Sequence, residues 1–175
     1  MKKPKISVIG LGYVGLPVSI AFDEAGYNVV GFDLDNERIE QLKNNFDKTN
    51  EIKKNRLTEC NINFTSDESK LSSSNFHIVT VPTPINEFKK PDFNYIISAS
   101  EILAKLLKKN DIVVYESTVY PGATEEIAVP ILEKISGMKI NSDFSVGYSP
   151  ERINPADPSH RFENIKKVVS ASNLN

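Results

Sequence analysis

Short runs of β-branched and other apolar residues alternate along the chain with segments in which apolar residues recur at helical spacing. The first run is Lys5 to Gly10, which ends in glycine, and apolar positions then recur every three or four residues until Gly26. Similar strand-like runs are Asn28 to Asp33, a weaker one near Ile62 to Thr65, Phe76 to Val81, Asp111 to Tyr115 and Phe144 to Tyr148. The pattern predicts repeated strand–helix units.

The segments between these runs predict the helices. Their apolar stripes are Val14, Val18, Ala21 and Ala25; Ile39, Leu42 and Phe46; Ile96, Ala99, Leu103 and Leu106; and Ile127, Ile131 and Ile135. Pro130 falls inside the last stripe and is expected to kink that helix, while Pro82 and Pro84 end the fourth strand. Lys167 to Ser170 is a candidate for a last, edge strand.

Strands that alternate with helices predict a mostly parallel sheet with helices on both faces. Right-handed crossovers then favour a doubly wound layer. We therefore expect an α/β fold of the Rossmann type. A chain of 175 residues is long enough for one well-packed domain and too short for two of full size, so residues 1–175 are expected to form a single domain.

The composition is that of an ordinary globular protein, with 39% hydrophobic and 25% charged residues. Its apolar runs fall short of the roughly 20 residues of a membrane span. The net charge of -2 gives no reason to expect nucleic acid, and Lys2, Lys3 and Lys5 are interpreted as solvating the first strand. A lone cysteine, Cys60, and the absence of a secretory signal pattern favour the cytoplasm. No metal site is predicted.

The segment Gly10-Leu11-Gly12-Tyr13-Val14-Gly15 matches G-x-G-x-x-G between the first predicted strand and the first predicted helix. In that context Gly10 can take the tight turn, Gly12 lets the backbone approach a pyrophosphate, and Gly15 lets helix and strand pack closely. The free N–H groups and positive dipole end of the helix favour phosphate. These residues, with Tyr13 and Val14, are the predicted cofactor-binding turn.

Asp33 ends the second predicted strand, 18 residues after Gly15. This is close to the spacing at which an acid accepts hydrogen bonds from the adenosine ribose hydroxyls, and a carboxylate there repels a 2′-phosphate. We therefore predict NAD as the cofactor rather than NADP. Asp35 and Arg38 are further candidates around the adenosine. Two alternatives remain: Asp33 caps a turn, and Arg38 is a solvated helix charge.

Four motifs together resemble the UDP-glucose/GDP-mannose dehydrogenase family: Val8 to Phe22 (VIGLGYVGLPVSIAF), Val81 to Pro84 (VPTP), Glu116 to Thr124 (ESTVYPGAT) and Ser149 to Pro155 (SPERINP). Their order and spacing also fit, and the resemblance covers nearly the whole chain. The SPERINP version, followed by His160-Arg161 and Asn164-Ile165, is most similar to the branch that oxidises UDP-N-acetylhexosamines for bacterial surface polysaccharides.

The resemblance implies oxidation of the C6 hydroxyl of a UDP-sugar to a carboxylate by successive hydride transfers to NAD. It also implies a cysteine thiolate that forms a covalent intermediate. We expect that cysteine beyond residue 175, with the family's central helix and nucleotide-sugar-binding domain, so this chain alone is expected to be inactive. The family forms homodimers through the central helix, and this part is compatible with a monomer. Cys60 is interpreted as a packing residue.

Within the chain the resemblance assigns catalytic roles to Thr118, which positions a water, and Glu151, which acts as base for thioester hydrolysis. Ser117 is predicted to contact the cofactor, as is Thr83, for which a rigid turn between prolines is an equal alternative. For Thr118 the alternative is a hydroxyl that bonds its own loop, and for Glu151 a surface ion pair with Arg152 or Arg161.

Two histidines remain. His77 lies in a predicted strand and is interpreted as a core or edge residue. His160 and Arg161, with Arg152, are candidates for the substrate side of the site, with a plain surface loop as the alternative. Two other functions stay open: a non-catalytic NAD-binding module, and a different dehydrogenase of the same fold.

Overall fold

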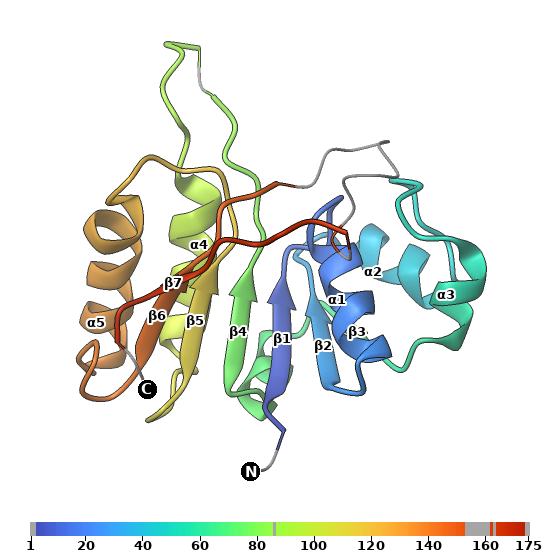
Figure 1. The fold of residues 1–175 in the computed structure, drawn as a ribbon, viewed down its shortest axis with the longest axis horizontal. Coiled ribbons are helices and arrows are strands. Elements are labelled where there is room, and N and C mark those ends of the chain that lie inside the picture. The colour runs from blue at the N-terminus through green and yellow to red at the C-terminus, as the bar shows by residue number, and fades with distance from the viewer. Residues whose placement is uncertain (1–2, 86, 153–161, 163, 174–175) are drawn as a thin grey trace.

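The computed structural model describes residues 3–85, 87–152, 162 and 164–173 (Figure 1). Its centre is a seven-stranded sheet in the order β3-β2-β1-β4-β5-β6-β7, in which all neighbours are parallel except the β6–β7 pair. The strands are β1 (Lys5–Ile9), β2 (Asn28–Phe32), β3 (Asn63–Thr65), β4 (Phe76–Val79), β5 (Ile112–Tyr115), β6 (Ser145–Tyr148) and β7 (Ser170–Ala171). The predicted doubly wound α/β fold is confirmed.

Helices cover both faces of this sheet (Figure 1). One apolar cluster joins the first strands to α1 (Gly15–Glu24), α2 (Asn36–Lys43) and α3 (Lys54–Glu59), and a second joins the sheet to α4 (Asn94–Ala104) and α5 (Val129–Ser136). A 3-10 turn, η1 (Glu68–Ser73), precedes β4. The chain leaves the neighbouring strands β1 and β4 toward opposite faces. The carboxyl ends of β1 and β4 therefore form a topological switch point, where such sheets bind ligands.

The apolar stripe predicted for α2, which was Ile39, Leu42 and Phe46, is wrong at Phe46. The helix ends at Lys43, and Asn45 adopts a left-handed conformation with φ 57° that turns the chain away. Phe46 is consequently 56% exposed, whereas Ile39 and Leu42 are buried as predicted. Helix α3, between this turn and β3, was not predicted.

The stripe predicted for the last helix is also wrong. A π-helical turn, η2 (Thr124–Ala128), precedes α5 and shifts the phase of the following residues. Ala128 and Leu132 are therefore fully buried, while Ile135 is 42% exposed. Pro130 is the second residue of α5 and closely follows the π-helical turn, so it stands at the junction of two helical segments, and the kink expected there stays a prediction.

The C-terminal segment returns across the face that carries α1. Phe162 and Ile165 pack against the α1 cluster, with the Phe162 and Phe22 ring centroids 6.3 Å apart. The predicted edge strand is displaced: pairing starts at Ser170, opposite Tyr148, and continues to Ala171. Val169, inside the predicted strand, is 73% exposed.

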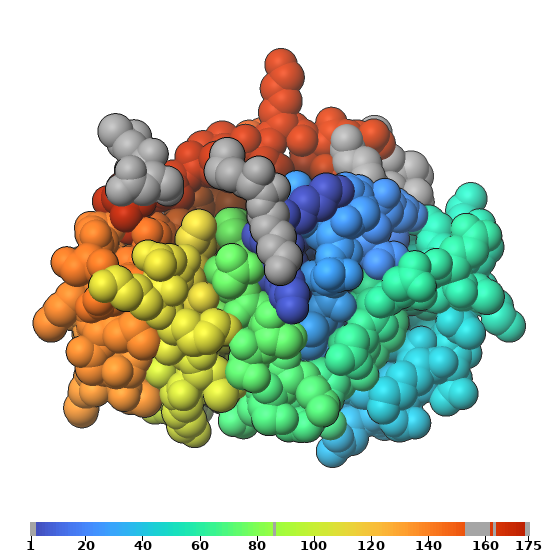
Figure 2. Space-filling view, turned by 90° about the horizontal axis from the view of Figure 1, so that it is seen from below, coloured from blue at the N-terminus to red at the C-terminus, as the bar shows by residue number. Residues whose placement is uncertain are grey.

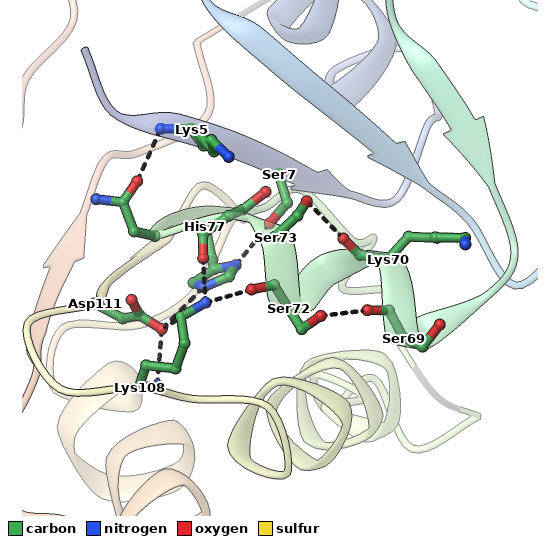
Figure 3. A network of polar contacts seen from close by, with 11 residues as sticks. Lys5, Ser7, Ser69, Lys70, Ser72, Ser73, His77, Lys108 and Asp111 are labelled. Carbon is green, nitrogen blue, oxygen red and sulfur yellow. Dashed lines mark hydrogen bonds and ion pairs between the residues drawn. The ribbon is translucent and has the colours of Figure 1, made fainter. Parts of the chain in front are cut away.

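The end of the sheet at which the parallel strands begin is called its amino edge here. At this amino edge, polar groups are bonded to one another. His77 is 1% exposed; 2.7 Å separate its Nδ1 from Ser7 Oγ, and 3.5 Å separate its Nε2 from Asp111 Oδ2 (Figure 3). The backbone N–H of Lys108 donates to Asp111 Oδ2 at 2.8 Å, and its ammonium donates to the carbonyls of Ser72 and Ser74. Seen from below, the start of the chain lies between the segments that precede β2 and β4, as the strand order requires (Figure 2). The interpretation of His77 as a core residue is confirmed.

Candidate functional site

A cavity of about 470 Å³ opens at the carboxyl edge of the sheet, the end at which the parallel strands finish, and extends across the switch point. The residues after β1, β2, β4, β5 and β6 all contribute to its wall. Of the predicted site residues, those that line it are Gly10, Gly12, Tyr13, Val14, Asp33, Arg38, Thr83, Ser117, Thr118 and Glu151. Its volume falls in the range typical of small-molecule and cofactor sites. The topology thus brings together residues that lie up to 141 positions apart in the sequence (Gly10 and Glu151).

The glycine turn has the geometry that a diphosphate requires. Gly10 has φ +91°, which favours glycine, and a Cβ on Gly15 would collide with the carbonyl oxygen of Gly10. By contrast, a Cβ on Gly12 would meet nothing within 4 Å, so space is open in front of its backbone. No side chain caps the start of α1, and its first turn holds no acidic residue. The helix N-terminus is therefore available to an anion, as the bound diphosphate of a dinucleotide would need.

Asp33 lies in the wall beside this turn. Its Oδ2 accepts a hydrogen bond from the backbone N–H of Leu11 at 2.8 Å, and its Oδ1 accepts one from Asp35 at 3.0 Å. Each carboxylate oxygen can accept a further hydrogen bond, which leaves capacity for a ribose diol. Asp33 therefore fixes the turn and faces the cavity as well, so the two interpretations of this residue are compatible.

Arg38 is not a solvated helix charge. It is 2% exposed, its Nε donates to the carbonyl of Leu11 at 2.8 Å, and its Nη2 lies 2.8 Å from Asp47 Oδ1. It braces the glycine turn against the loop after α2. Whether Arg38 also contacts the adenosine stays a prediction, which its place in the cavity wall supports.

Asp47, which the sequence analysis missed, organises that loop. Its carboxylate accepts hydrogen bonds from Thr49 and from the backbone N–H of Ile52, and it pairs with Arg38. Burial alone would raise the pKa of Asp47, but these hydrogen bonds outweigh it and lower that pKa. Lys48 and Thr49 are thereby held in the cavity wall. The Asp-x-Thr spacing is the signal of a side-chain-capped turn that could have identified it.

Hydroxyl groups fix the loops at the other end of the cavity. Ser117 Oγ donates to the carbonyl of Val81 at 2.7 Å, and Thr83 Oγ1 donates to the carbonyl of Thr118 at 2.6 Å. The loops after β4 and β5 are thus tied together. The contact of Thr83 with a cofactor and the alternative of a rigid turn between prolines both stay predictions.

The two predicted catalytic residues follow neighbouring strands. Thr118 is exposed after β5, and Glu151 is half-buried after β6. Burial and the negative charge of Glu151 both raise the pKa of Tyr13, whose side chain is on the same wall. Arg152 is described but is outside the cavity lining, and His160 and Arg161 fall outside the described residues.

A buried ion pair completes this end of the site and was not predicted. Glu116, 5% exposed, lines the cavity directly before Ser117 and contacts the ammonium of Lys167. Burial lowers the pKa of Lys167 to about 8. The sequence offered only a weak signal, a glutamate at the carboxyl end of a strand, because its partner comes from a distant segment.

Cys60 lies away from the cavity wall. It is half-buried at the end of α3, its thiol donates to the carbonyl of Leu57 at 3.2 Å, and burial raises its pKa. A protonated thiol is a poor nucleophile, so the interpretation of Cys60 as a packing residue holds. Over the described ranges, no helix has both the length and the apolar character to cross a bilayer, and no group of three or more His, Cys, Asp or Glu is placed to hold a metal ion.

A parallel sheet of this order, with a glycine turn at the switch point and an acid after β2, defines a dinucleotide-binding Rossmann domain. Residues 4–173 match the UDP-glucose/GDP-mannose dehydrogenase family, NAD binding domain. The chain belongs to this family and corresponds to its NAD-binding domain.

Individual relatives agree with this assignment. The chain is 54% identical to Protein CapL of Staphylococcus aureus over 97% of its own length, and 54% identical to UDP-N-acetyl-D-glucosamine 6-dehydrogenase of Salmonella typhi over 96%. It spans about 40% of the length of each of these relatives. Among solved structures, UDP-D-ManNAc dehydrogenase from Pyrococcus horikoshii superposes with a TM-score of 0.86 at 31% identity, over 95% of this chain and 41% of that one.

Proposed function

We propose that this chain supplies the NAD site of an enzyme that oxidises the C6 hydroxyl of a UDP-hexose, specifically a UDP-N-acetylhexosamine, to a uronate for surface polysaccharide synthesis. The observation that carries the proposal is the convergence of the glycine turn, Asp33, Thr118 and Glu151 on one cavity. The similarity to UDP-N-acetyl-D-glucosamine 6-dehydrogenases supports the substrate class.

In this proposal each residue of the cavity has a separate role. Asp33 accepts hydrogen bonds from the adenosine ribose, and the glycine turn and the start of α1 bind the diphosphate. Thr118 positions a water, and Glu151 removes its proton during hydrolysis of the covalent intermediate. Arg152, His160 and Arg161 are proposed to contact the UDP-sugar. When bound, NAD supplies the hydride acceptor.

The proposal extends to the organisation of the protein. Residues 1–175 form one NAD-binding domain, and the cysteine nucleophile and most contacts to the UDP-sugar belong to a further part of a longer enzyme. This chain alone therefore binds NAD without turning over a UDP-sugar. The full-length enzyme is a cytoplasmic homodimer, and the domain alone is a monomer.

Two measurements test the proposal. Calorimetry and thermal melting on this chain should show that NAD binds and raises the melting temperature, and that UDP-N-acetylglucosamine does not. The full-length protein should then reduce NAD with UDP-N-acetylhexosamines, with UDP-glucose and small hydroxyacids as controls. Activity on hydroxyacids alone would identify a different dehydrogenase, and NAD binding without turnover of any UDP-sugar would identify a non-catalytic module.

The role of Glu151 can be tested separately in the full-length enzyme. Glu151→Gln keeps the size of the side chain but removes the base, so the covalent intermediate should accumulate and be visible by mass spectrometry. Normal turnover with no adduct would remove Glu151 from the mechanism.

A further inference from the structure

Glu116, which forms an ion pair with Lys167, stands in the cavity wall at the end opposite Asp33. The backbone N–H of Glu116 donates to the carbonyl of Val79 at 2.7 Å, so this residue is held within the sheet just after β5. Its side chain is 4% exposed and that of Lys167 is 17% exposed. A negative charge in the cavity wall and the counter-charge that contacts it are therefore both fixed where water reaches poorly.

Lys167 is anchored on the side away from the cavity. Its ammonium lies 5.7 Å from the centroid of the Phe162 ring, and Phe162 packs against Phe22 of α1. Glu116 lines the cavity, whereas Lys167 is not among the described lining residues. The carboxylate is thus the charge nearer to a bound ligand, and the ammonium lies behind it.

The part of the ligand that reaches Glu116 follows from the rest of the site, and this step rests on the proposed NAD binding. Asp33 marks the adenosine end and the glycine turn marks the diphosphate. A dinucleotide that lies across the switch point then extends its nicotinamide toward the ends of β5 and β6. Glu116 stands at the end of β5.

The nicotinamide ring is the part of the cofactor whose charge changes in the reaction. The oxidised ring carries a positive charge and the reduced ring is neutral. An unpaired carboxylate in a wall of low dielectric would favour the oxidised form, and an unpaired ammonium would favour the reduced form, because Coulomb energies are larger there than in water. Burial lowers the pKa of Lys167 to about 8, which is still above 7, so the ammonium is mostly charged at pH 7.

We propose that Glu116 and Lys167 together set the relative affinity of the site for the oxidised and reduced nicotinamide dinucleotide, with Glu116 facing the ring and Lys167 as the positioning residue that holds and neutralises it. A balanced pair lets the site bind the cofactor before and after hydride transfer without retaining either form.

The test is a double-mutant cycle on this chain at pH 7, with dissociation constants measured for NAD by calorimetry and for NADH by fluorescence. Glu116→Gln leaves the ammonium unbalanced and should shift the ratio of the two constants roughly tenfold toward NADH. Lys167→Met leaves the carboxylate unbalanced and should shift it roughly tenfold toward NAD. The double variant should return the ratio to within about twofold of the wild type.

Two further variants are matched controls. Lys167→Arg keeps the charge and should keep the ratio, as should Lys166→Met, which removes a neighbouring exposed lysine. Single variants that weaken both forms of the cofactor equally would show a structural pair and overturn the inference. Should Lys167→Met fail to fold, Glu116→Gln decides: an unchanged ratio overturns the inference and a shift toward NADH supports it. Failure of the wild type to bind either form would overturn the proposed function and this inference with it.

Discussion

The two edges of the sheet treat polar side chains in opposite ways. At the amino edge, Ser7, His77 and Asp111 are buried and bonded to one another, and they line neither the carboxyl-edge cavity nor the cavity beside Lys5, Asn28 and Ser74 (Figure 3). At the carboxyl edge, Asp33 and Glu151 line an open cavity. Both edges consist of strand ends with similar polar residues. The difference teaches that polar groups bonded to one another hold the strands together, whereas those that face open space are available to a ligand.

The largest expected effect concerns the glycine turn at the carboxyl edge, where one glycine is needed for stability and another for NAD binding. In Gly15→Ala the new methyl group collides with the carbonyl of Gly10 and the hydroxyl of Thr80. The free energy of unfolding should fall by about 3 kcal/mol or more. Gly12→Ala is the matched control, because a Cβ there meets nothing within 4 Å. Urea denaturation should give Gly12→Ala the same free energy of unfolding as the wild type. Calorimetry should show that this variant no longer binds NAD. Normal NAD binding would exclude the expected diphosphate contact.

A substitution of Asp47 tests whether the carboxyl edge also contains polar groups that stabilise the fold, besides those that face the cavity. Asp47→Asn leaves Arg38 buried without its counter-charge and should cost about 3 kcal/mol of stability at pH 7. Because the folded-state pKa of Asp47 is lowered, its contribution is complete above the unfolded value of about 3.9 and is lost as the pH falls through the folded value.

The stability of wild type and Asp47→Asn, measured from pH 7 to 2, should therefore converge in acid. A difference that stays constant with pH would mean that the charge of Asp47 is not what stabilises the loop.

At the amino edge we expect an effect on stability alone. His77→Ala removes a buried ring and leaves Ser7 and Asp111 without that partner, which should cost about 2.5 kcal/mol. The dissociation constant for NAD should not change. Weaker NAD binding with unchanged stability would contradict the division between the two edges.

An effect of similar or smaller size is expected for Asp33→Ala, which should weaken NAD binding by about 1.5 to 3 kcal/mol, the value of hydrogen bonds to a charged group. Glu37→Ala, which removes an exposed carboxylate from α2, is the control. Calorimetry with NAD is the measurement, and equal affinities for the two variants would remove Asp33 from the cofactor site.

The sequence predicted the strands and the sheet well, because buried parallel strands are continuous apolar runs that local patterns reveal. It also placed the glycine turn and Asp33, whose roles depend on neighbours near in sequence. It failed where a backbone irregularity changes the phase, as at Asn45 and at the π-helical turn before α5. It missed Asp47 and the Glu116–Lys167 pair, because tertiary partners give those side chains their roles and no local pattern marks such partners.

The hydrogen bond from Leu11 to Asp33 has a consequence for attempts to redesign the coenzyme preference. Exchanging Asp33 for a small residue, as one would to admit the extra phosphate of NADP, also deprives the turn of its acceptor. Under the predicted role of Asp33, such a change removes selectivity and preorganisation together. A switch of coenzyme in this protein therefore requires a second substitution that restores a partner for that amide.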